Sequence, residues 1–280
     1  MSASNVRRVR VANDVFQLTL SLRENRRQRA RQRRFLVEGV RPINQAVRSG
    51  WPIEAFWYDG DRKLSGWAGD LLDSAVAPLR YELSGELMLA LSQKDDPSEL
   101  LAVAVIPDDD LGRIPVRADA LVVIFDRPVS PGNLGSVIRS ADAFGADGVI
   151  VTGHAADVYD PQTVRASMGS LFAVPVVRAA GVDDVAAWGE VGGLRLVGSS
   201  ASATMPVASV DLAGPTMLVV GNETKGLSRA WRDRCDELVA IPMRGTASSL
   251  NAAAAASVLL YEADRQRRGA RARDSGGHAA

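Results

Sequence analysis

Short apolar runs separated by helical patterns dominate the second half of the chain. The runs lie at residues 120–126, 148–153, 174–178, 195–200, 216–221 and 237–243. Apolar residues at helical spacing occur at 133–145, 181–191 and 227–235. Nearly continuous apolar runs of this length are typical of strands buried on both faces. The alternation of such strands with helices predicts an α/β domain with a mostly parallel sheet.

The first half mixes strand and helix patterns less regularly. We predict strands at 35–39, 53–59 and 100–107, and helices at 41–50 and 85–93. The stretch "PDDDLGRIPVRAD" is polar and contains two prolines, which is typical of a linker. The predicted organisation is therefore a smaller α/β domain at 1–106, a linker at 107–119, a second domain at 120–268 and a flexible tail at 269–280.

Composition narrows the possible classes of protein. No apolar run reaches about 18 residues, and the polar N-terminus has no signal core, so we predict a cytoplasmic protein without a membrane span. The single cysteine, Cys235, excludes an internal disulfide and indicates a core thiol. The only histidines are His154 and His278, which argues against a His/Cys metal site. A Ser-His-Asp triad would need His154, and no G-x-S-x-G motif supports it.

Charge is balanced overall but unevenly placed. Ten arginines lie between Arg7 and Arg34, where Asp14 and Glu24 are the only acids. A dense run of arginine favours a surface that contacts phosphates, although a solvated helix face is the alternative. The arginines that we expect to contact phosphates of such a partner are Arg26, Arg27, Arg33 and Arg34.

The loop after the first strand of the second domain reads "DRPVSPGNLGSVIRSADAFG". We expect Asn133 to be the N-cap of the following helix, which Gly145 would end. Arg139 lies off the apolar stripe of that helix. This loop is either an ordinary strand-turn-helix with a solvated arginine or part of a ligand site. Parallel sheets bind ligands at the carboxyl ends of their strands, where this loop lies.

Two further loops follow predicted strands at the same edge. In "LVVGNETKGLS", Gly221 and Gly226 enclose Asn222 and Glu223, and such a turn lets the backbone approach a ligand. Its spacing fits neither a Walker loop nor G-x-G-x-x-G. The third loop, "IPMRGTASSLN", leads into five alanines, whose small side chains suggest that something large comes close to the backbone.

Together the three loops resemble the motifs of the SpoU (TrmH-like) RNA ribose 2′-O-methyltransferases of the SPOUT superfamily. The matching residues are Asn133 and Arg139, Gly221-Asn222-Glu223 with Gly226, Ile241-Pro242-Met243, and Ser248-Ser249-Leu250-Asn251. This resemblance implies a C-terminal segment threaded into a deep trefoil knot, for which residues 252–256 supply a slim backbone. It also implies a homodimer. The first half is similar, more weakly, to the ribosomal-protein-L30-like substrate-binding domain of the family.

The resemblance implies methyl transfer from S-adenosylmethionine to a ribose 2′-hydroxyl of RNA, without a metal. The family's catalytic positions correspond to Asn133, Arg139, Glu223, Ser249 and Asn251. Its cofactor positions correspond to Gly221, Asn222, Gly226, Ile241, Met243 and Leu250. Glu223 would hold Arg139 or a ribose. Arg139 is either the base or an electrostatic clamp, and a guanidinium with a pKa above about 12 is a poor base.

A separate N-terminal domain is commoner in family members that act on ribosomal RNA, so 23S rRNA is the expected substrate. Antibiotic-resistance enzymes of the avilamycin and thiostrepton type share this layout, and resistance is therefore an expected role. The alternatives are a tRNA 2′-O-methyltransferase and a non-catalytic RNA-binding protein on the same scaffold. A nucleotide-binding dehydrogenase would need a glycine fingerprint that the sequence lacks.

Overall fold

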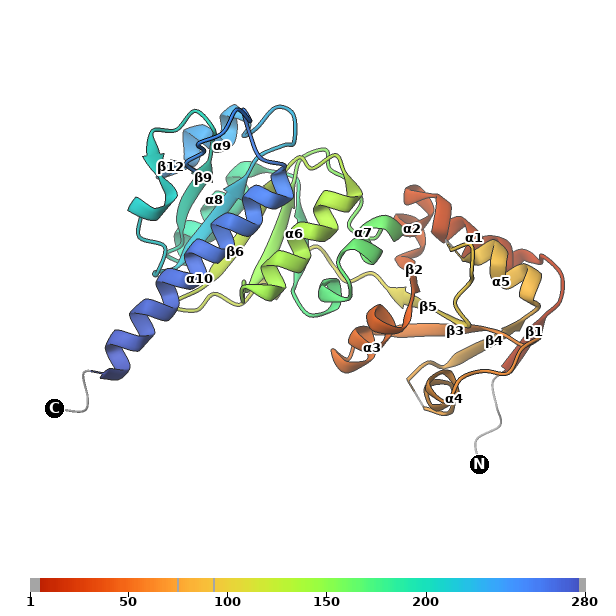
Figure 1. Ribbon diagram of the computed structural model, residues 1–280. Helices are drawn as coiled ribbons and strands as arrows, with labels where there is room; N and C mark the ends of the chain where they lie inside the picture. The colour runs from red at the N-terminus through yellow and green to blue at the C-terminus, as the bar shows by residue number, and fades with distance from the viewer. Residues whose placement is uncertain (1–5, 75, 93, 277–280) are drawn as a thin grey trace. The chain divides into compact units, whose positions relative to one another are not determined.

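The computed structural model describes residues 6–74, 76–92 and 94–276. The chain divides into two compact units (Figure 1). The N-terminal unit comprises Met1–Pro107 and Tyr159–Ala173, and the C-terminal unit comprises Asp108–Val158 and Val174–Ala280. In the part of the chain that is described, no helix is long and apolar enough to cross a membrane.

The N-terminal unit contains a five-stranded mixed sheet in the order β1-β4-β3-β5-β2. Its strands are β1 (Val6–Val9), β2 (Arg34–Glu38), β3 (Ile53–Asp59), β4 (Leu79–Leu83) and β5 (Leu100–Val105). Strands β1, β4 and β3 are parallel, and β5 runs antiparallel to β3 and β2. The three predicted strands are confirmed. The pattern did not predict β1 and β4, because polar residues interrupt "VRRV" and "LRYEL".

Short helices surround this sheet. They are α1 (Asp14–Glu24), α2 (Arg26–Gln32), α3 (Val40–Arg48), α4 (Gly66–Asp73), α5 (Gly85–Leu91) and α7 (Pro161–Ala166). The predicted helices at 41–50 and 85–93 correspond to α3 and α5. The Asn25 side chain accepts hydrogen bonds from Arg27 N and Gln28 N, so it caps α2 directly after α1 ends. Trp57 stacks on Tyr81 in the core, with ring centroids 4.1 Å apart.

The segment Tyr159–Ala173 belongs to the N-terminal unit, although it follows the first strands of the C-terminal unit in the sequence. Its Phe172 ring lies 5.1 Å from the ring of Trp51 and 6.1 Å from that of Phe35, and Tyr159 lies 4.8 Å from Phe35. Aromatic contacts at these distances fix the segment on α3 and β2. The apolar pattern did not predict this return, so the domain limits drawn from the sequence stay predictions.

The C-terminal unit is built on a seven-stranded sheet in the order β10-β12-β9-β11-β6-β7-β8, with every pairing parallel. Its strands are β6 (Leu121–Asp126), β7 (Gly148–Thr152), β8 (Val176–Ala179), β9 (Arg195–Ser199), β10 (Met205–Pro206), β11 (Thr216–Val220) and β12 (Glu237–Ala240). The predicted parallel sheet is confirmed, together with its six strands. The two-residue β10 is too short for periodicity to indicate.

The order of the strands places a switch point between β6 and β11. The chain leaves β6 toward β7 on one side and leaves β11 toward β12 on the other. Loops that diverge at such a point open a crevice at the carboxyl ends of the strands. The helices of this unit are α6 (Pro131–Ala143), α8 (Val182–Val191), α9 (Arg229–Arg234) and α10 (Ala252–Gly276), and Figure 1 shows α10 alongside α6.

Helix α10 continues through Gly276. The helix thus extends into the stretch from residue 269, because arginines and alanines favour helix. The flexible tail expected at 269–280 stays a prediction. Residues 277–280, which include His278, lie outside the described residues. The trefoil knot stays a prediction. Cys235 packs close to Gly198 and lies next to Asp236, and burial followed by the charge of Asp236 raises the pKa of its thiol to about 12.

Candidate active site

Helix α6 begins one turn earlier than its sequence pattern suggested. The cap is Ser130, whose Oγ accepts a hydrogen bond from Asn133 N at 3.3 Å, and Pro131 occupies the first helical position. The prediction of Asn133 as the N-cap was wrong, because proline is pre-organised for the first turn and shifts the start. The Asn133 side chain is thereby released from capping and reaches other loops.

Glu223, in the loop after β11, joins that loop to the start of α6. Its carboxylate accepts hydrogen bonds from Val129 N and Ser130 N, each at 3.0 Å, and from Asn133 Nδ2 at 3.2 Å. Burial alone raises the pKa of this carboxyl, but these hydrogen bonds outweigh it and lower the net pKa below its ordinary value of 4.5. Glu223 is therefore an ionised acceptor at neutral pH.

Asn251 adds the third loop to this network. Its Nδ2 donates to Asn133 Oδ1 at 3.1 Å, while its Oδ1 accepts from Ala253 N at 2.9 Å. Asn251 thus caps α10 and contacts α6 at the same time. The three motif loops are connected through the hydrogen-bonded series Glu223–Asn133–Asn251, which brings three of the five predicted catalytic residues together.

The other two predicted catalytic residues stand apart from this series. Arg139 lies further along α6 with an exposed side chain. Its guanidinium makes no hydrogen bond or ion pair with the residues that the structure describes, so Glu223 does not hold it. Ser249 lies in the wall of the adjacent pocket. Arg139 is therefore a cation without a partner inside this part of the protein.

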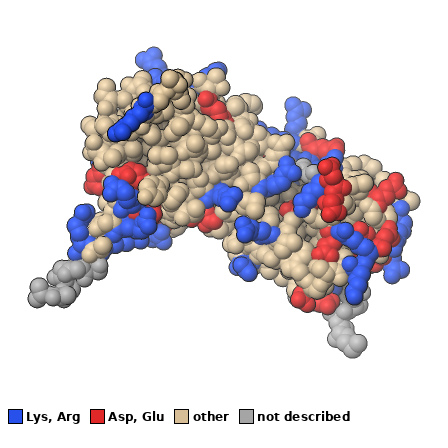
Figure 2. Space-filling model, viewed as in Figure 1, with Lys and Arg blue, Asp and Glu red and all other residues tan. Residues whose placement is uncertain are grey.

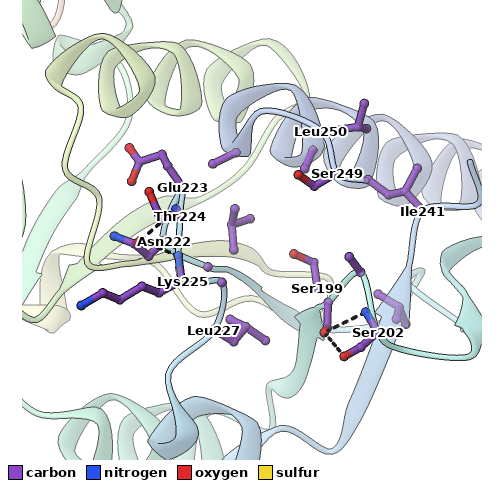
Figure 3. A pocket seen from close by; sticks show the side chains of 18 of the residues that line it. Ser199, Ser202, Asn222, Glu223, Thr224, Lys225, Leu227, Ile241, Ser249 and Leu250 are labelled. Atoms are coloured by element: carbon purple, nitrogen blue, oxygen red, sulfur yellow. Dashed lines mark hydrogen bonds between the residues drawn. The ribbon is translucent and has the colours of Figure 1, made fainter. Parts of the chain in front are cut away.

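A pocket of about 350 Å³ opens beside Glu223, which is within the size range of ligand sites. All six predicted cofactor residues line it: Gly221, Asn222, Gly226, Ile241, Met243 and Leu250. Figure 3 shows the loop that contains Asn222 and Lys225 on one side of the pocket, and Ile241 and Leu250 on another. The residues that the sequence resemblance assigned to the cofactor therefore line a single cavity.

The loop Ser199–Ser202 completes the wall, and our reading of the sequence missed it (Figure 3). It follows β9, the strand between β11 and β12, at the same edge of the sheet. A signal was present, because "GSSAS" ends a buried strand at the carboxyl edge. Small residues after a strand are also typical of ordinary turns, so this signal is weak by itself.

Glycine is required in the loop that follows β11. A Cβ on Gly221 would lie 2.3 Å from the carbonyl carbon of Gly226, and Gly226 itself has φ +64°. The Asn222 side chain donates to Arg127 O at 2.7 Å and accepts from Lys225 N at 2.9 Å. Arg127 in turn binds Asp126 through two nitrogens and donates to Gly226 O at 3.1 Å. These contacts fix the conformation of the loop.

The arginines expected to contact RNA lie in the N-terminal unit, and two of them already serve the fold. Arg34 pairs with Glu54, and Arg33 Nη2 donates to Ile106 O at 3.0 Å. Arg27 is exposed on the first turn of α2. Figure 2 shows acidic side chains interleaved with basic ones on this unit. Clustering of arginine along the sequence therefore does not produce a uniformly basic surface on the face in view.

These features define a class of protein. The site lies at the switch point of a parallel sheet, with a partly apolar pocket, a glycine loop and a fixed carboxylate–amide series beside it. This arrangement suits a nucleoside-like cofactor and a polar acceptor. Among the described residues, no cluster of His, Cys, Asp and Glu that could hold a metal ion is found.

The chain belongs to the SpoU rRNA methylase family, whose model matches residues 120–261, while a SpoU L30e-like domain model matches 13–102. It is 51% identical over 267 residues to a 23S rRNA (uridine(2479)-2′-O)-methyltransferase of Streptomyces viridochromogenes, and the matched region covers 93% of each chain. An uncharacterized tRNA/rRNA methyltransferase of Mycobacterium avium is 34% identical, over 83% of this chain and 78% of the relative. The family predicted from the three loops is confirmed.

Solved structures agree over both units. The SpoU methyltransferase AviRb from Streptomyces viridochromogenes, in complex with the cofactor AdoMet, has a TM-score of 0.87 at 51% identity. This match covers 91% of this chain and 98% of that one. An AdoMet-bound rRNA methyltransferase from Sinorhizobium meliloti has a TM-score of 0.85 at 29% identity, covering 93% and 98%.

Proposed function

We propose that this protein transfers a methyl group from S-adenosylmethionine to a ribose 2′-hydroxyl of 23S rRNA, in the cytoplasm. The observation that carries the proposal is the series Glu223–Asn133–Asn251 beside the 350 Å³ pocket. The relatives support the same choice, since one is named for 2′-O-methylation of 23S rRNA and its structural counterpart holds AdoMet.

The pocket suits this cofactor. Ile241, Met243 and Leu250 provide apolar contact for an adenine and a thioether chain. The fixed loop Gly221–Gly226 offers main-chain groups at the other wall. S-adenosylmethionine supplies an electrophilic methyl group on a sulfonium, so the protein's own task is to align an oxygen with it. Correct alignment contributes up to about 7–11 kcal/mol to such reactions.

Arg139 acts in this proposal as an electrostatic clamp. Its exposed guanidinium is free to bind an RNA phosphate or the alkoxide that develops on the ribose oxygen. A guanidinium does not give up its proton readily, so a role as base is disfavoured. Ser249 and Asn251 orient the ribose. Glu223 stays ionised and fixes Asn133, so it is a positioning residue for the amide series.

The protein is proposed to work as a homodimer that pairs through α6 and α10. Figure 2 shows a broad area on the C-terminal unit with few charged side chains, over the position of these helices in Figure 1. Val258 and Tyr261 of α10 are 38% and 51% exposed. A two-fold axis would pair this face with itself. Sedimentation that shows a fully active monomer at micromolar concentration would rule the dimer out.

The substrate class is tested by supplying S-adenosylmethionine with a labelled methyl group to separated 23S rRNA, 16S rRNA and tRNA. Label in 23S rRNA alone is expected. Label in tRNA alone would favour the tRNA enzyme. Binding of S-adenosylmethionine without transfer to any RNA would favour a non-catalytic RNA-binding protein. A role in antibiotic resistance stays a prediction, to be tested by drug susceptibility of a host that expresses the protein.

A further inference from the structure

Three hollows of the N-terminal unit meet at Lys94. The most apolar of them has a volume of about 250 Å³ and lies between the start of α3 and α7. Leu36, Pro42 and Val164 line its apolar part. The second hollow shares Lys94 and Arg165 with it, and the third shares Lys94. We refer to the first hollow, bordered by Arg41, Lys94 and Arg165, as the α3–α7 groove.

The cations of the α3–α7 groove have hydrogen-bond donors that make no contact within the described residues. Arg41 and Arg165 are exposed, and neither guanidinium makes a hydrogen bond or ion pair with other residues in the described ranges. Lys94 Nζ donates to Ser98 Oγ at 2.9 Å, one of the three donors that an ammonium carries. These cations come from three segments far apart in the sequence. They converge on one hollow with a strong capacity to bind an anion.

The acids nearby are used for holding loops. Glu38 also lines the groove, and its Oε1 accepts from Ser92 Oγ at 2.6 Å, which fixes the loop of Lys94 beside β2. Asp160 caps α7 through Gln162 N. Asp95 borders the second hollow and not the α3–α7 groove. The charge at the groove's edge is therefore predominantly positive.

Met168 is held at the groove in a strained backbone conformation. Its φ is +53°, which side chains of this kind rarely adopt, and 37% of the residue is exposed. The next residue, Gly169, comes so close to α3 that a Cβ there would lie 3.1 Å from Gln45 Cβ. Strain of this kind persists where the surrounding structure enforces it, and it is concentrated at functional sites.

We propose that the α3–α7 groove holds one unpaired nucleotide of the substrate RNA. Its base would lie on the apolar floor and against Met168, and its phosphates would bind Arg41, Lys94 and Arg165. Proteins recognise RNA sequence mainly at unpaired nucleotides, through an apolar surface for the base and cations for the backbone. The inference rests on the proposed function, which supplies RNA as the substrate.

The test uses the full chain and three variants. Arg41→Gln with Arg165→Gln removes the two free cations, and Met168→Gly removes the apolar contact while suiting the positive φ. Arg48→Gln, on the last turn of α3 and outside the hollows, is the matched control. Binding of a 23S rRNA transcript is measured across a salt series, and methyl transfer is measured as KM and kcat.

The double variant is expected to lower the slope of log affinity against log salt by about 1.4, which is about 0.7 per lost phosphate contact. Its KM should rise about tenfold or more, with kcat and the cofactor Kd unchanged. Met168→Gly should raise KM without changing the slope, and Arg48→Gln should match the wild type.

The proposal is overturned if the double variant binds the transcript with the affinity and slope of Arg48→Gln. It is also overturned if the groove binds uridine monophosphate while the double variant keeps full RNA affinity, because the groove would then serve a free nucleotide. Should the wild type methylate no RNA, the proposed function fails, and the binding series still decides whether the groove contacts RNA.

Discussion

At the scale of single residues, the site separates positioning from contact with substrate. Glu223 and Asn133 bind one another and the backbone, whereas Arg139 makes no such contact within the described residues. Mutation of a group that binds only substrate leaves folding and cofactor affinity intact, whereas mutation of a group that holds the site in place affects them.

Replacement of Arg139 by alanine is expected to lower kcat about 10²–10³-fold, the usual cost of losing a donor that stabilises developing charge. Cofactor affinity should not change. Arg139→Lys should not restore the rate, because an ammonium lacks the planar fork of a guanidinium. Arg273→Ala, which removes another exposed arginine of the C-terminal unit, is the control. A near-normal kcat in Arg139→Ala would contradict the role given to this residue.

Glu223→Gln keeps the shape of the side chain and removes its charge. We expect methyl transfer to fall and the free energy of unfolding to drop by about 1–3 kcal/mol at neutral pH. The folded-state pKa of Glu223 lies below 4.5. Its stabilising contribution is therefore complete above that pH and is lost as the pH falls through the folded-state pKa. Urea unfolding of both proteins should give a difference that shrinks in acid, whereas a constant difference would argue against the assignment.

At the scale of elements, α10 is fixed to the amino ends of the central strands by one buried arginine. Arg267 is 8% exposed and donates to the carbonyl oxygens of Leu212, Gly214, Asp119 and Ala120. These carbonyls come from the segments that enter β6 and β11. The arginine thus holds the helix that carries the Asn251 cap in register with the sheet.

Arg267→Met should destabilise the protein by at least about 2 kcal/mol, because it leaves buried carbonyl oxygens without donors. Arg268→Met is the matched control, since Arg268 forms a surface pair with Asp264 at 2.8 Å, and such pairs contribute about 0–1 kcal/mol. Chemical denaturation of both variants measures the difference. Equal midpoints would show that Arg267 is dispensable.

The sequence predicted elements well where burial is continuous and poorly where it is not. The parallel strands, such as Leu121–Asp126, are buried throughout and almost entirely apolar, and they were found. Val6–Val9 has two adjacent arginines in its middle and was missed. The pocket residues were predicted from the resemblance of three loops to the SpoU motifs, and each of these loops follows a strand. The Glu223–Asn133 contact was not predictable, since it depends on Ser130 taking the cap and freeing Asn133.

At the scale of the whole molecule, each unit is built from two separate stretches of the chain. The stretch Tyr159–Ala173 belongs to the N-terminal unit although it lies between strands of the C-terminal one. The polar linker pattern at 107–119 indicates only one of the places where the chain passes from one unit to the other. The contacts of Phe172 and Tyr159 with Phe35 are long-range, and periodicity carries no information about them.

A truncated chain that begins at Asp119 is therefore expected to expose Phe172 and its neighbours, which Phe35 and Trp51 otherwise cover. It should bind a hydrophobic dye more strongly than the full chain and aggregate more readily. Dye fluorescence and light scattering at matched concentration measure this. A truncated protein as compact and soluble as the full chain would show that the segment folds back independently.

The central claim is that one ribose of 23S rRNA receives the methyl group at the site built by Asn133, Glu223 and Asn251. The most direct test is nucleotide-resolution mapping of 2′-O-methylation on 23S rRNA incubated with S-adenosylmethionine and either the wild type or Arg139→Ala. We expect one new 2′-O-methylated nucleotide with the wild type and none with the variant. A methyl group on a base, or the same modification with both proteins, would contradict it.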